Sequence, residues 1–411
     1  MNVLGIVSEY NPFHNGHLYH LNKSVEISKA DFTICIMSGN FLQRGAPALF
    51  NKWIRAEAAV KNGIDLVIEL PFAFASSSAE YFSQGAISIL DKLGCVTHIS
   101  FGSENGNITS LYSAAQILSH ESSPFKGHLR EHLSKGMSFP NAREISLNKI
   151  TDDSDTANIL NQPNNILGIE YLKWLIRLNS KIEAITIPRH IADYNDPRIQ
   201  SSICSATAIR KLMADTANVE SLKSVIPIFT YETISEYMNK GLAPVFIDDM
   251  FNFIKYKLLM SDPAELRKIF SVTEGIENRI LNQLYHLDTM EDLIKYIKTK
   301  RYTRTSIQRI LIHILMGLTK KDMHIFQNNE NCLYARILGF SANGSNLIRF
   351  IKESDASLLP LITNINKEVT PDAPFYPLLK YDLLSSDIYH LASGKYNMYQ
   401  ESDYVRKPFI L

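Results

Sequence analysis

The chain has 411 residues, with 42 Lys and Arg against 42 Asp and Glu, so its formal net charge is zero. Hydrophobic residues make up 45% of the chain, which is typical of globular proteins and excludes a largely disordered one. The neutral balance excludes a protein that binds nucleic acid through overall charge, so an RNA partner would need a local basic surface. At roughly 100–200 residues per domain, the length predicts two or three domains.

The sequence carries no pattern typical of secretion or membrane insertion. No apolar run approaches the ~18 residues of a membrane span, and the N-terminal residues lack the basic start of a signal peptide. The four cysteines lie far apart and show no zinc-type spacing. They are Cys35, Cys95, Cys204 and Cys332. We therefore expect a cytoplasmic protein with buried thiols, without a membrane partner or an obligate protein partner.

The first two hundred residues alternate short apolar runs with helix-length segments. Runs of the length of a buried strand occur at residues 3–7, 32–37, 66–70, 97–101 and 182–187. Helices are predicted between them at residues 17–29, 52–62, 79–93 and 108–119. This alternation predicts an α/β fold with a doubly wound parallel sheet of the Rossmann type. In such sheets ligands bind beyond the carboxyl ends of the strands.

Two further regions differ from this pattern. A polar stretch near residues 122–162 is expected to be a helical insertion into a sheet domain that spans residues 1–213. From residue 214 to 411 helical periodicity dominates, which predicts a second, mainly helical domain. Helices are expected there at residues 231–239, 250–259, 288–297 and 305–318. The pattern of residues 354–411 predicts no particular fold.

The clearest motif follows the first predicted strand directly. It reads SEYNPFHNGH over residues 8–17 and places two histidines around Gly16, where a helix is predicted to begin. The N-terminus of a helix binds anions, and a glycine lets the backbone approach a phosphate closely. His14 and His17 can then donate hydrogen bonds to oxygens that gain charge in a transition state. The alternative is that His14 caps the helix and His17 lies on its surface.

A second motif, SATAIR at residues 205–210, suits the same chemistry. Ser205 is a good N-cap residue, Thr207 lies in the first turn, and Arg210 adds a positive fork one turn later. These groups can hold the β- and γ-phosphates of a nucleotide. An ordinary capped helix would show the same pattern.

Together the two motifs resemble those of the HIGH-type nucleotidyltransferase superfamily, whose members carry HxGH after the first strand and a late ISSTxxR-like motif. Ala206 stands here in place of one serine of that late motif. At a finer level the chain resembles the bacterial tRNA-Met cytidine acetate ligase family. The likeness is carried by GIVSEYNPFHNGH (5–17), MSGNFLQRG (37–45), QPNNILG (162–168), KRYTR (300–304) and YARILGF (334–340). It therefore spans most of the chain.

That resemblance implies a reaction and a site. The family activates acetate with ATP, giving acetyl-adenylate and pyrophosphate, and then acetylates N4 of the wobble cytidine in elongator tRNA-Met. The resemblance implies His14, His17 and Arg210 as catalytic residues and ATP as co-substrate with Mg²⁺, although no carboxylate is a clear metal ligand. The implied ATP site comprises Val7, Ser8, Glu9, Tyr10, Asn11, Pro12, Phe13, His14, Asn15, Gly16, His17, Leu18, Tyr19, His20, Gly102, Asn164 (or its neighbour Asn165), Arg189, His190, Ser205 and Thr207. For Gly102 a simple turn, and for Asn164 a helix cap after Pro163, are the alternatives.

A basic segment marks a candidate RNA surface. No acidic residue occurs between Leu293 and Lys321, and tyrosines are interleaved with the basic residues there. Local positive charge with aromatic rings is typical of phosphate contacts and base stacking. The predicted tRNA contacts are Arg44, Lys298, Lys300, Arg301, Tyr302, Arg304 and Arg309. A solvated helix face is the alternative for the segment. For Arg44, in the loop after the second strand, acetate is a second possible ligand and an ordinary surface loop is the bland interpretation.

Two other functions compete with the acetate ligase. A small-molecule nucleotidyltransferase that makes a dinucleotide cofactor, of the NAD or dephospho-CoA type, explains HxGH equally well but leaves the basic segment without a role. An RNA-binding scaffold with a vestigial nucleotide pocket explains the basic segment. It does not explain why both histidines, Gly16 and Arg210 are retained.

Overall fold

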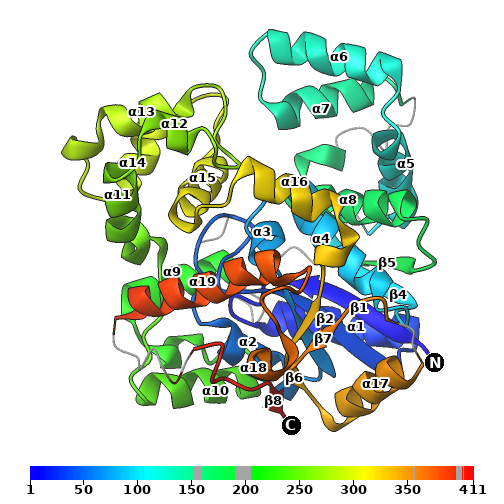
Figure 1. The fold of residues 1–411 in the computed structure, drawn as a ribbon. Coiled ribbons are helices and arrows are strands. Elements are labelled where there is room, and N and C mark those ends of the chain that lie inside the picture. Colours follow the sequence, from blue (N-terminus) through cyan, green and yellow to red (C-terminus); the bar gives the residue numbers. More distant parts are fainter. Residues whose placement is uncertain (105, 152–158, 190–204, 355–356, 395–399, 401) are drawn as a thin grey trace.

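A single mixed sheet forms the centre of the molecule (Figure 1). The computed structural model describes residues 1–104, 106–151, 159–189, 205–354, 357–394, 400 and 402–411. Its strands are β1 (Val3–Ser8), β2 (Phe32–Ser38), β3 (Leu66–Leu70), β4 (His98–Ser103), β5 (Glu183–Pro188), β6 (Ala335–Phe340), β7 (Leu361–Ile362) and β8 (Phe409–Ile410). The strand order is β5-β4-β1-β2-β3-β6-β7, with β8 beside β6. Neighbouring strands among β1–β5 are parallel, which confirms the predicted α/β class.

The carboxyl ends of the parallel strands meet at one edge of the sheet. Ser8 at the end of β1 pairs with Met37, and Ser38 at the end of β2 pairs with Leu70. The loops that leave β1, β2, β4 and β5 therefore lie along the same edge, which we call the ligand edge. The HxGH motif, which follows the first strand, was predicted to lie there.

Helices cover both faces of this sheet. They are α1 (Asn15–Ser28), α2 (Lys52–Lys61), α3 (Phe72–Ala75), α4 (Ala79–Lys92), α5 (Ile108–Ser119) and α8 (Pro163–Arg177). Alternate residues of β1 point to opposite faces: Leu4 and Ile6 pack with α1 and α2, whereas Val3 packs with α4, α5 and α8. The strands are thus buried on both faces, as their apolar runs predicted.

Between α5 and α8 the chain leaves the sheet. Helices α6 (Ser123–Ser134) and α7 (Phe139–Asn148) pack on each other and stand away from the sheet, in cyan at the top of Figure 1. They fall within the segment predicted as a helical insertion. No helix in the described residues is long and apolar enough to cross a bilayer.

The second half of the chain is mainly helical. Its helices are α9 (Ala206–Thr216), α10 (Ile228–Asn239), α11 (Phe251–Leu259), α12 (Pro263–Leu266), α13 (Ile276–Asn282), α14 (Met290–Ile297), α15 (Arg304–Met316), α16 (Lys320–Asn328), α17 (Ala342–Glu353), α18 (Ile365–Glu368) and α19 (Tyr376–Ser393). The sequence pattern did not indicate β6, which pairs antiparallel with β3 and so joins the second half to the sheet. The boundary at residue 213 stays a prediction.

A buried group of four charges ties the C-terminal residues to the sheet. Lys52 Nζ lies 2.7 and 2.8 Å from the two carboxylate oxygens of Glu69 and 2.7 Å from Asp403 Oδ2. Arg336 Nη1 lies 2.9 Å from the same oxygen of Asp403. None of the four side chains is more than 3% exposed. Burial alone would raise the pKa of Asp403, but Arg336 and Lys52 hold it below its usual value. Two cations balance two carboxylates, as burial requires.

Candidate active site

The loop after β1 leads directly into the N-terminus of α1. His14 occupies the N-cap position with extended backbone, and its carbonyl accepts the His17 N–H at 2.8 Å. The two imidazoles stack, with ring centroids 3.7 Å apart and planes 19° from parallel. His14 is therefore an N-cap residue and still shares one pocket with His17.

Both histidines are neutral near pH 7. Burial, aided by Arg189 and Arg210, lowers the pKa of His14 to about 3. Burial, then His14 and Arg189, lowers the pKa of His17 well below its usual value. His17 Nδ1 accepts the backbone N–H of His14 at 3.2 Å, which assigns the His17 proton to Nε2. His17 can thus donate a hydrogen bond from Nε2 without carrying charge.

One polar atom of this pair has no hydrogen-bond partner among the described residues. His14 Nδ1 is buried and makes no hydrogen bond to any described residue. A buried polar atom without a partner is costly, and buried polar groups are otherwise almost always paired. The pair therefore presents a nitrogen that a bound ligand can satisfy.

Helix α9 brings the late motif to the same loop. Ser205 Oγ accepts the Ala208 N–H at 3.2 Å, so Ser205 caps α9 as predicted. Arg210 Nη1 donates to the Asn11 carbonyl at 3.1 Å, and its Nη2 donates to Thr207 Oγ1, also at 3.1 Å. The guanidinium thus joins two motifs that lie 199 residues apart in the chain.

Strands β4 and β5 contribute Gly102 and Arg189 to the ligand edge. A Cβ on Gly102 would come within 3.0 Å of Arg189 Nε, so the glycine leaves room for that arginine. Arg189 is exposed, and after burial it is the main cause that lowers the pKa of His20 to about 4. Arg189 is therefore a cation beside the histidines. His190, its predicted companion, lies outside the described residues.

The N-terminus of α8 holds a carboxylate of the chain itself. Glu104 Oε1 accepts the backbone N–H of Asn164 at 3.1 Å and its Nδ2 at 2.7 Å. Glu104 Oε2 accepts the N–H of Asn165 at 2.9 Å. Such a carboxylate is favoured at the positive end of a helix. Asn165 is 1% exposed, whereas Asn164 is partly exposed, so Asn164 is the better placed of the two to meet a ligand.

Sequence reasoning missed Arg55, a buried residue that holds the loops of the ligand edge through hydrogen bonds to their backbone carbonyls. Its side chain is 2% exposed. The guanidinium donates to the carbonyls of Phe50 at 2.9 Å, Glu9 at 2.6 Å and Ser38 at 3.0 Å, and also to that of Gly39. Burial lowers the pKa of Arg55 to about 10, which still leaves it charged at pH 7. Arg55 therefore fastens the loops after β1 and β2 to each other. A charged residue amid the apolar side of a helix was the only available signal.

The basic segment at residues 298–304 lies between α14 and α15. Lys298 and Lys300 are exposed. Arg301 Nη1 lies 3.0 Å from Glu274, and Arg304 Nη2 lies 2.5 Å from Glu291. The segment contains no acidic residue in sequence, but the fold supplies carboxylates from its neighbours.

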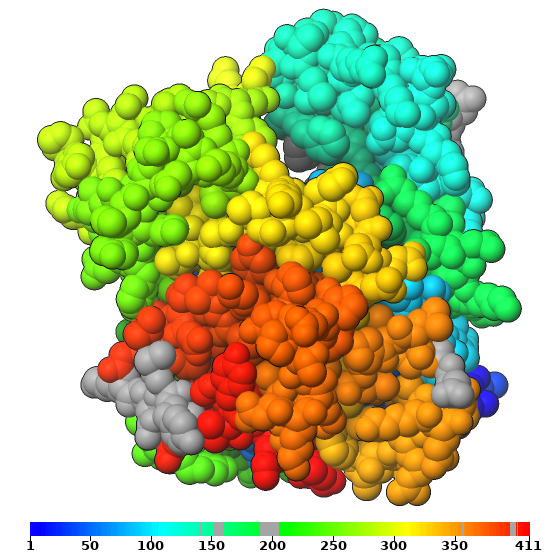
Figure 2. Space-filling model, in the orientation of Figure 1, coloured from blue at the N-terminus to red at the C-terminus, as the bar shows by residue number. Residues whose placement is uncertain are grey.

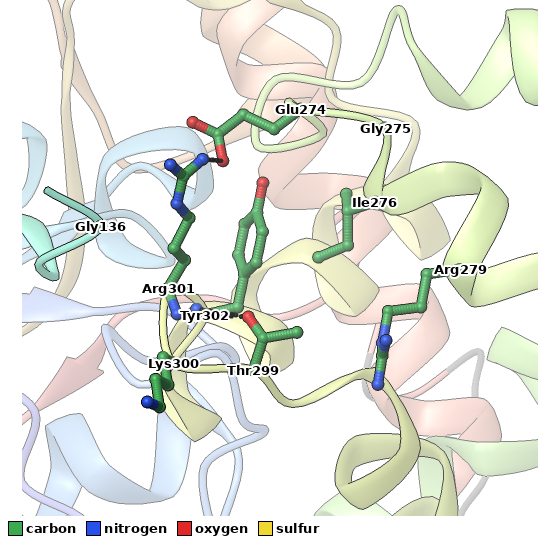
Figure 3. A pocket seen from close by; sticks show the side chains of 9 residues that line it. All are labelled: Gly136, Glu274, Gly275, Ile276, Arg279, Thr299, Lys300, Arg301 and Tyr302. Carbon is green, nitrogen blue, oxygen red and sulfur yellow. Dashed lines mark hydrogen bonds and ion pairs between the residues drawn. The ribbon is translucent and has the colours of Figure 1, made fainter. Parts of the chain in front are cut away.

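An open pocket of about 410 Å³ lies beside this basic segment (Figure 3). It is lined by Gly136, Glu274, Gly275, Ile276, Arg279, Thr299, Lys300, Arg301 and Tyr302. Gly136 belongs to the turn between α6 and α7, so the helical insertion forms one wall of the pocket. Figure 2 shows the surface hollowed between that insertion and the second half of the chain. Tyr302 donates from its hydroxyl to the Thr273 carbonyl at 2.9 Å, which fixes its ring there.

The two remaining predicted RNA contacts occupy different environments. Arg44 is exposed at the turn after β2. Arg309 is half-buried in α15, where its Nη1 donates to the Gln43 carbonyl at 3.2 Å. The predicted RNA residues therefore do not form one uniform surface.

Comparison with known proteins shows the family to which the chain belongs. The family model described as HIGH Nucleotidyl Transferase matches residues 1–403. The tRNA(Met) cytidine acetate ligase of Caldicellulosiruptor saccharolyticus is 42% identical over 412 residues, covering 100% of this chain and 99% of its own. The enzyme of that name from Acetivibrio thermocellus is 44% identical, covering 95% and 94%. The apo crystal structure of Thermotoga maritima TmcAL, 33% identical, superposes with a TM-score of 0.93 over 100% of both chains. A second structure of TmcAL, bound with alpha-thio ATP, superposes with a TM-score of 0.91 at the same identity and coverage.

Proposed function

Because this chain belongs to the HIGH nucleotidyltransferase family and, within it, to the tRNA(Met) cytidine acetate ligases, we propose that it joins acetate to tRNA-Met with ATP. An acetate oxygen attacks the α-phosphorus of ATP, which gives acetyl-adenylate and releases pyrophosphate. N4 of the wobble cytidine in elongator tRNA-Met then attacks the acetyl carbonyl. AMP leaves, the amine loses a proton, and the product is N4-acetylcytidine.

His14 and His17 stabilise the first transition state by hydrogen bonding. Negative charge grows on the phosphoryl oxygens as pyrophosphate departs. The lowered pKa values of both imidazoles exclude them as charged acids at pH 7. His17 Nε2–H, held in that tautomer by the His14 backbone, is a donor that needs no reorientation when charge develops.

Fixed cations and hydroxyls hold the rest of ATP. Arg210 and Thr207, already in contact with each other, bind the β- and γ-phosphates, and Ser205 orders the start of α9. Arg189 adds positive charge beside His14, and Asn164 binds from the start of α8. Mg²⁺ would accompany the nucleotide and offset the negative charge of its phosphates. In the described residues no three His, Cys, Asp or Glu side chains gather into a ready-made metal site, so ATP phosphates would supply most of its ligands.

The RNA is held by exposed basic residues and the half-buried Tyr302, all outside the nucleotide site. The contacts are Arg44, Lys298, Lys300, Arg301, Tyr302 and Arg304. Proteins that modify a base inside an RNA loop must unstack it, and the wobble cytidine is presented to the acetyl-adenylate in that way. The reaction takes place in the cytoplasm, where tRNA and ATP are found together.

The observation that carries this proposal is the neutral, stacked His14–His17 pair, joined through Asn11 to Arg210. The test is to incubate the purified protein with ATP, labelled acetate and total bacterial tRNA, and then to digest the RNA to nucleosides. We expect label in N4-acetylcytidine that depends on ATP. Pyrophosphate release with a mononucleotide, but no labelled nucleoside, would instead favour an enzyme that makes a dinucleotide cofactor.

A further inference from the structure

The middle of α15 connects the basic segment to the loop after β1, which carries His14 and is called the nucleotide loop below. The loop after β2 packs directly on this helix at Gly45, whose φ is +71°. A Cβ at Gly45 would lie 2.2 Å from the backbone nitrogen of Arg309 and 2.5 Å from the carbonyl carbon of Gln308. Only a glycine fits there, because backbone meets backbone without space for a side chain.

Arg309 strengthens this contact with its side chain. Its Nη1 donates to the carbonyl of Gln43, two residues before Gly45. Burial lowers the pKa of Arg309 to about 10, so the guanidinium keeps its charge at pH 7. No carboxylate in the described residues forms an ion pair with the Arg309 guanidinium. Its hydrogen bond to the Gln43 carbonyl therefore holds it against this loop. Such a half-buried arginine is engaged by the protein, in contrast to the exposed Lys298 and Lys300.

Gln43 passes the contact on to the nucleotide loop. Its backbone N–H donates to Glu9 Oε1 at 2.9 Å, and Glu9 is the first residue after β1. The carbonyl of Glu9 in turn accepts Arg55 Nη1 at 2.6 Å. The peptide groups on either side of Gln43 thus join α15 to the segment that leads into His14.

These contacts place Arg309 between the proposed RNA-binding segment and the proposed nucleotide site. Thr303, the N-cap residue of α15, lies within the basic segment, and Arg309 is on the same helix. We propose that Arg309 is a positioning residue, which transmits the seating of α15 on RNA to the nucleotide loop through Gln43 and Glu9. The inference rests on the proposed acetate ligase activity and gives Arg309 a different role from the direct RNA contact predicted from sequence.

The test compares Arg309→Ala with Arg304→Ala, a matched arginine at the exposed start of the same helix. Single-turnover acetyl transfer at saturating tRNA, the tRNA dissociation constant and its salt dependence are measured for each full-length variant. For Arg309→Ala we expect acetyl transfer to fall about tenfold with tRNA affinity within about twofold of wild type. For Arg304→Ala we expect the reverse, with weaker affinity and a salt slope smaller by about one.

Two further variants guard against a purely structural effect. Arg309→Lys keeps a donor that can reach the Gln43 carbonyl, and it should recover at least half of the lost rate. A Glu9→Ala, Arg309→Ala double variant should lose less than the product of the two single losses, because both substitutions break one chain of contacts. If Arg309→Ala does not fold, Arg309→Lys against wild type still reports the split between rate and affinity.

Specific results would overturn the proposal. Weaker tRNA binding with a flatter salt dependence in Arg309→Ala would make Arg309 a phosphate contact. An unchanged transfer rate, or a double variant whose losses simply multiply, would remove the connection through Gln43. If wild type itself produces no labelled N4-acetylcytidine, the proposed function fails instead, and the comparison of variants is not reached.

Discussion

The ligand edge and the basic segment 298–304 carry opposite kinds of electrostatics. At the ligand edge the histidines are buried and neutral, and Arg55 is held by four backbone carbonyls. In the basic segment the charges lie in solvent and pair with Glu274 and Glu291. Water and salt screen the charges of the second region more strongly than they screen the buried groups of the first. The difference teaches that the proposed chemistry uses fixed groups, whereas the proposed RNA affinity is spread over weak, exposed contacts.

The largest effect is expected at the buried group of four charges that includes Lys52. Lys52→Met leaves Glu69 and Asp403 buried with only Arg336 to balance them, so we expect a loss of about 3–5 kcal/mol in the free energy of unfolding. Urea denaturation measures it. Lys295→Met is the control: this lysine is 68% exposed and lies 3.7 Å from Glu291, and we expect a change within about 0.5 kcal/mol. Equal effects of the two substitutions would remove the distinction between the regions.

The next largest effect is catalytic. His17→Ala removes a preorganised donor from the phosphoryl oxygens, so we expect adenylate formation to fall about 10²–10³-fold. The tRNA affinity should stay within about twofold, because the basic segment is untouched. Acetate-dependent exchange of pyrophosphate into ATP measures the first quantity and filter binding the second. The exposed His286→Ala is the matched control. Full exchange activity in His17→Ala would move the chemistry away from this pair.

The buried histidines also predict how stability depends on pH. The pKa values of His14 and His20 are lowered to about 3 and about 4, against about 6.5 when unfolded. Below pH 6.5 the unfolded chain binds protons that the folded chain does not. Stability is therefore complete above this pH and is lost as pH falls toward the folded values. Each histidine should cost about 1.6 kcal/mol between pH 6.5 and pH 5.

Urea denaturation at pH 5, 6 and 7 checks this dependence. His20→Gln should flatten it by the share of one histidine, and the exposed His286→Gln should leave it unchanged. An equal slope in wild type and in His20→Gln would show that His20 is not buried in its neutral form.

The smallest effects belong to the basic segment. Arg301→Ala with Arg304→Ala should weaken tRNA binding and flatten its salt dependence. Glu274→Gln and Glu291→Gln should act in the opposite direction, because they release these arginines from ion pairs worth up to about 1 kcal/mol each. We expect tRNA binding up to about fivefold tighter at low salt, measured by filter binding. An unchanged salt dependence in the double arginine variant would show that the segment is a solvated surface that does not contact RNA.

The local features of the ligand edge could be predicted from sequence. The five apolar runs of the first half became β1–β5, and Ser205 caps α9 as its residue type indicated. Both follow from rules that act over a few residues. A strand buried on both faces is apolar along its length, and a serine hydroxyl accepts hydrogen bonds from the first N–H groups of a helix. The HxGH motif was recognisable for the same reason, since its glycine and histidines are adjacent in the chain.

The long-range contacts could not be predicted. β6 contains the charged Arg336, which the buried carboxylates of Asp403 and Glu69 neutralise in the core. The pairing of β6 with β3 and the contacts of Arg55 with backbone carbonyls join segments that are far apart in the chain. No local sequence pattern indicates that such segments come together. A truncation at the predicted boundary near residue 213 would remove β6 from the sheet, so it would not separate two independent functions.

The antiparallel pairing of β6 with β3 has a consequence for how the protein is made. Leu66 of β3 pairs with Phe340 of β6, 274 residues later in the chain (340 − 66), and a ribosome that adds ~5–20 residues per second needs roughly 14–55 s to pass from one to the other. During that interval the outer edge of β3 has no partner strand and is open to pairing with other chains. The loop after β2 also waits for α19, because Asn40 Nδ2 donates to Ser386 Oγ at 3.1 Å. The loop after β2 therefore reaches its final contacts only after residue 386 has been synthesised.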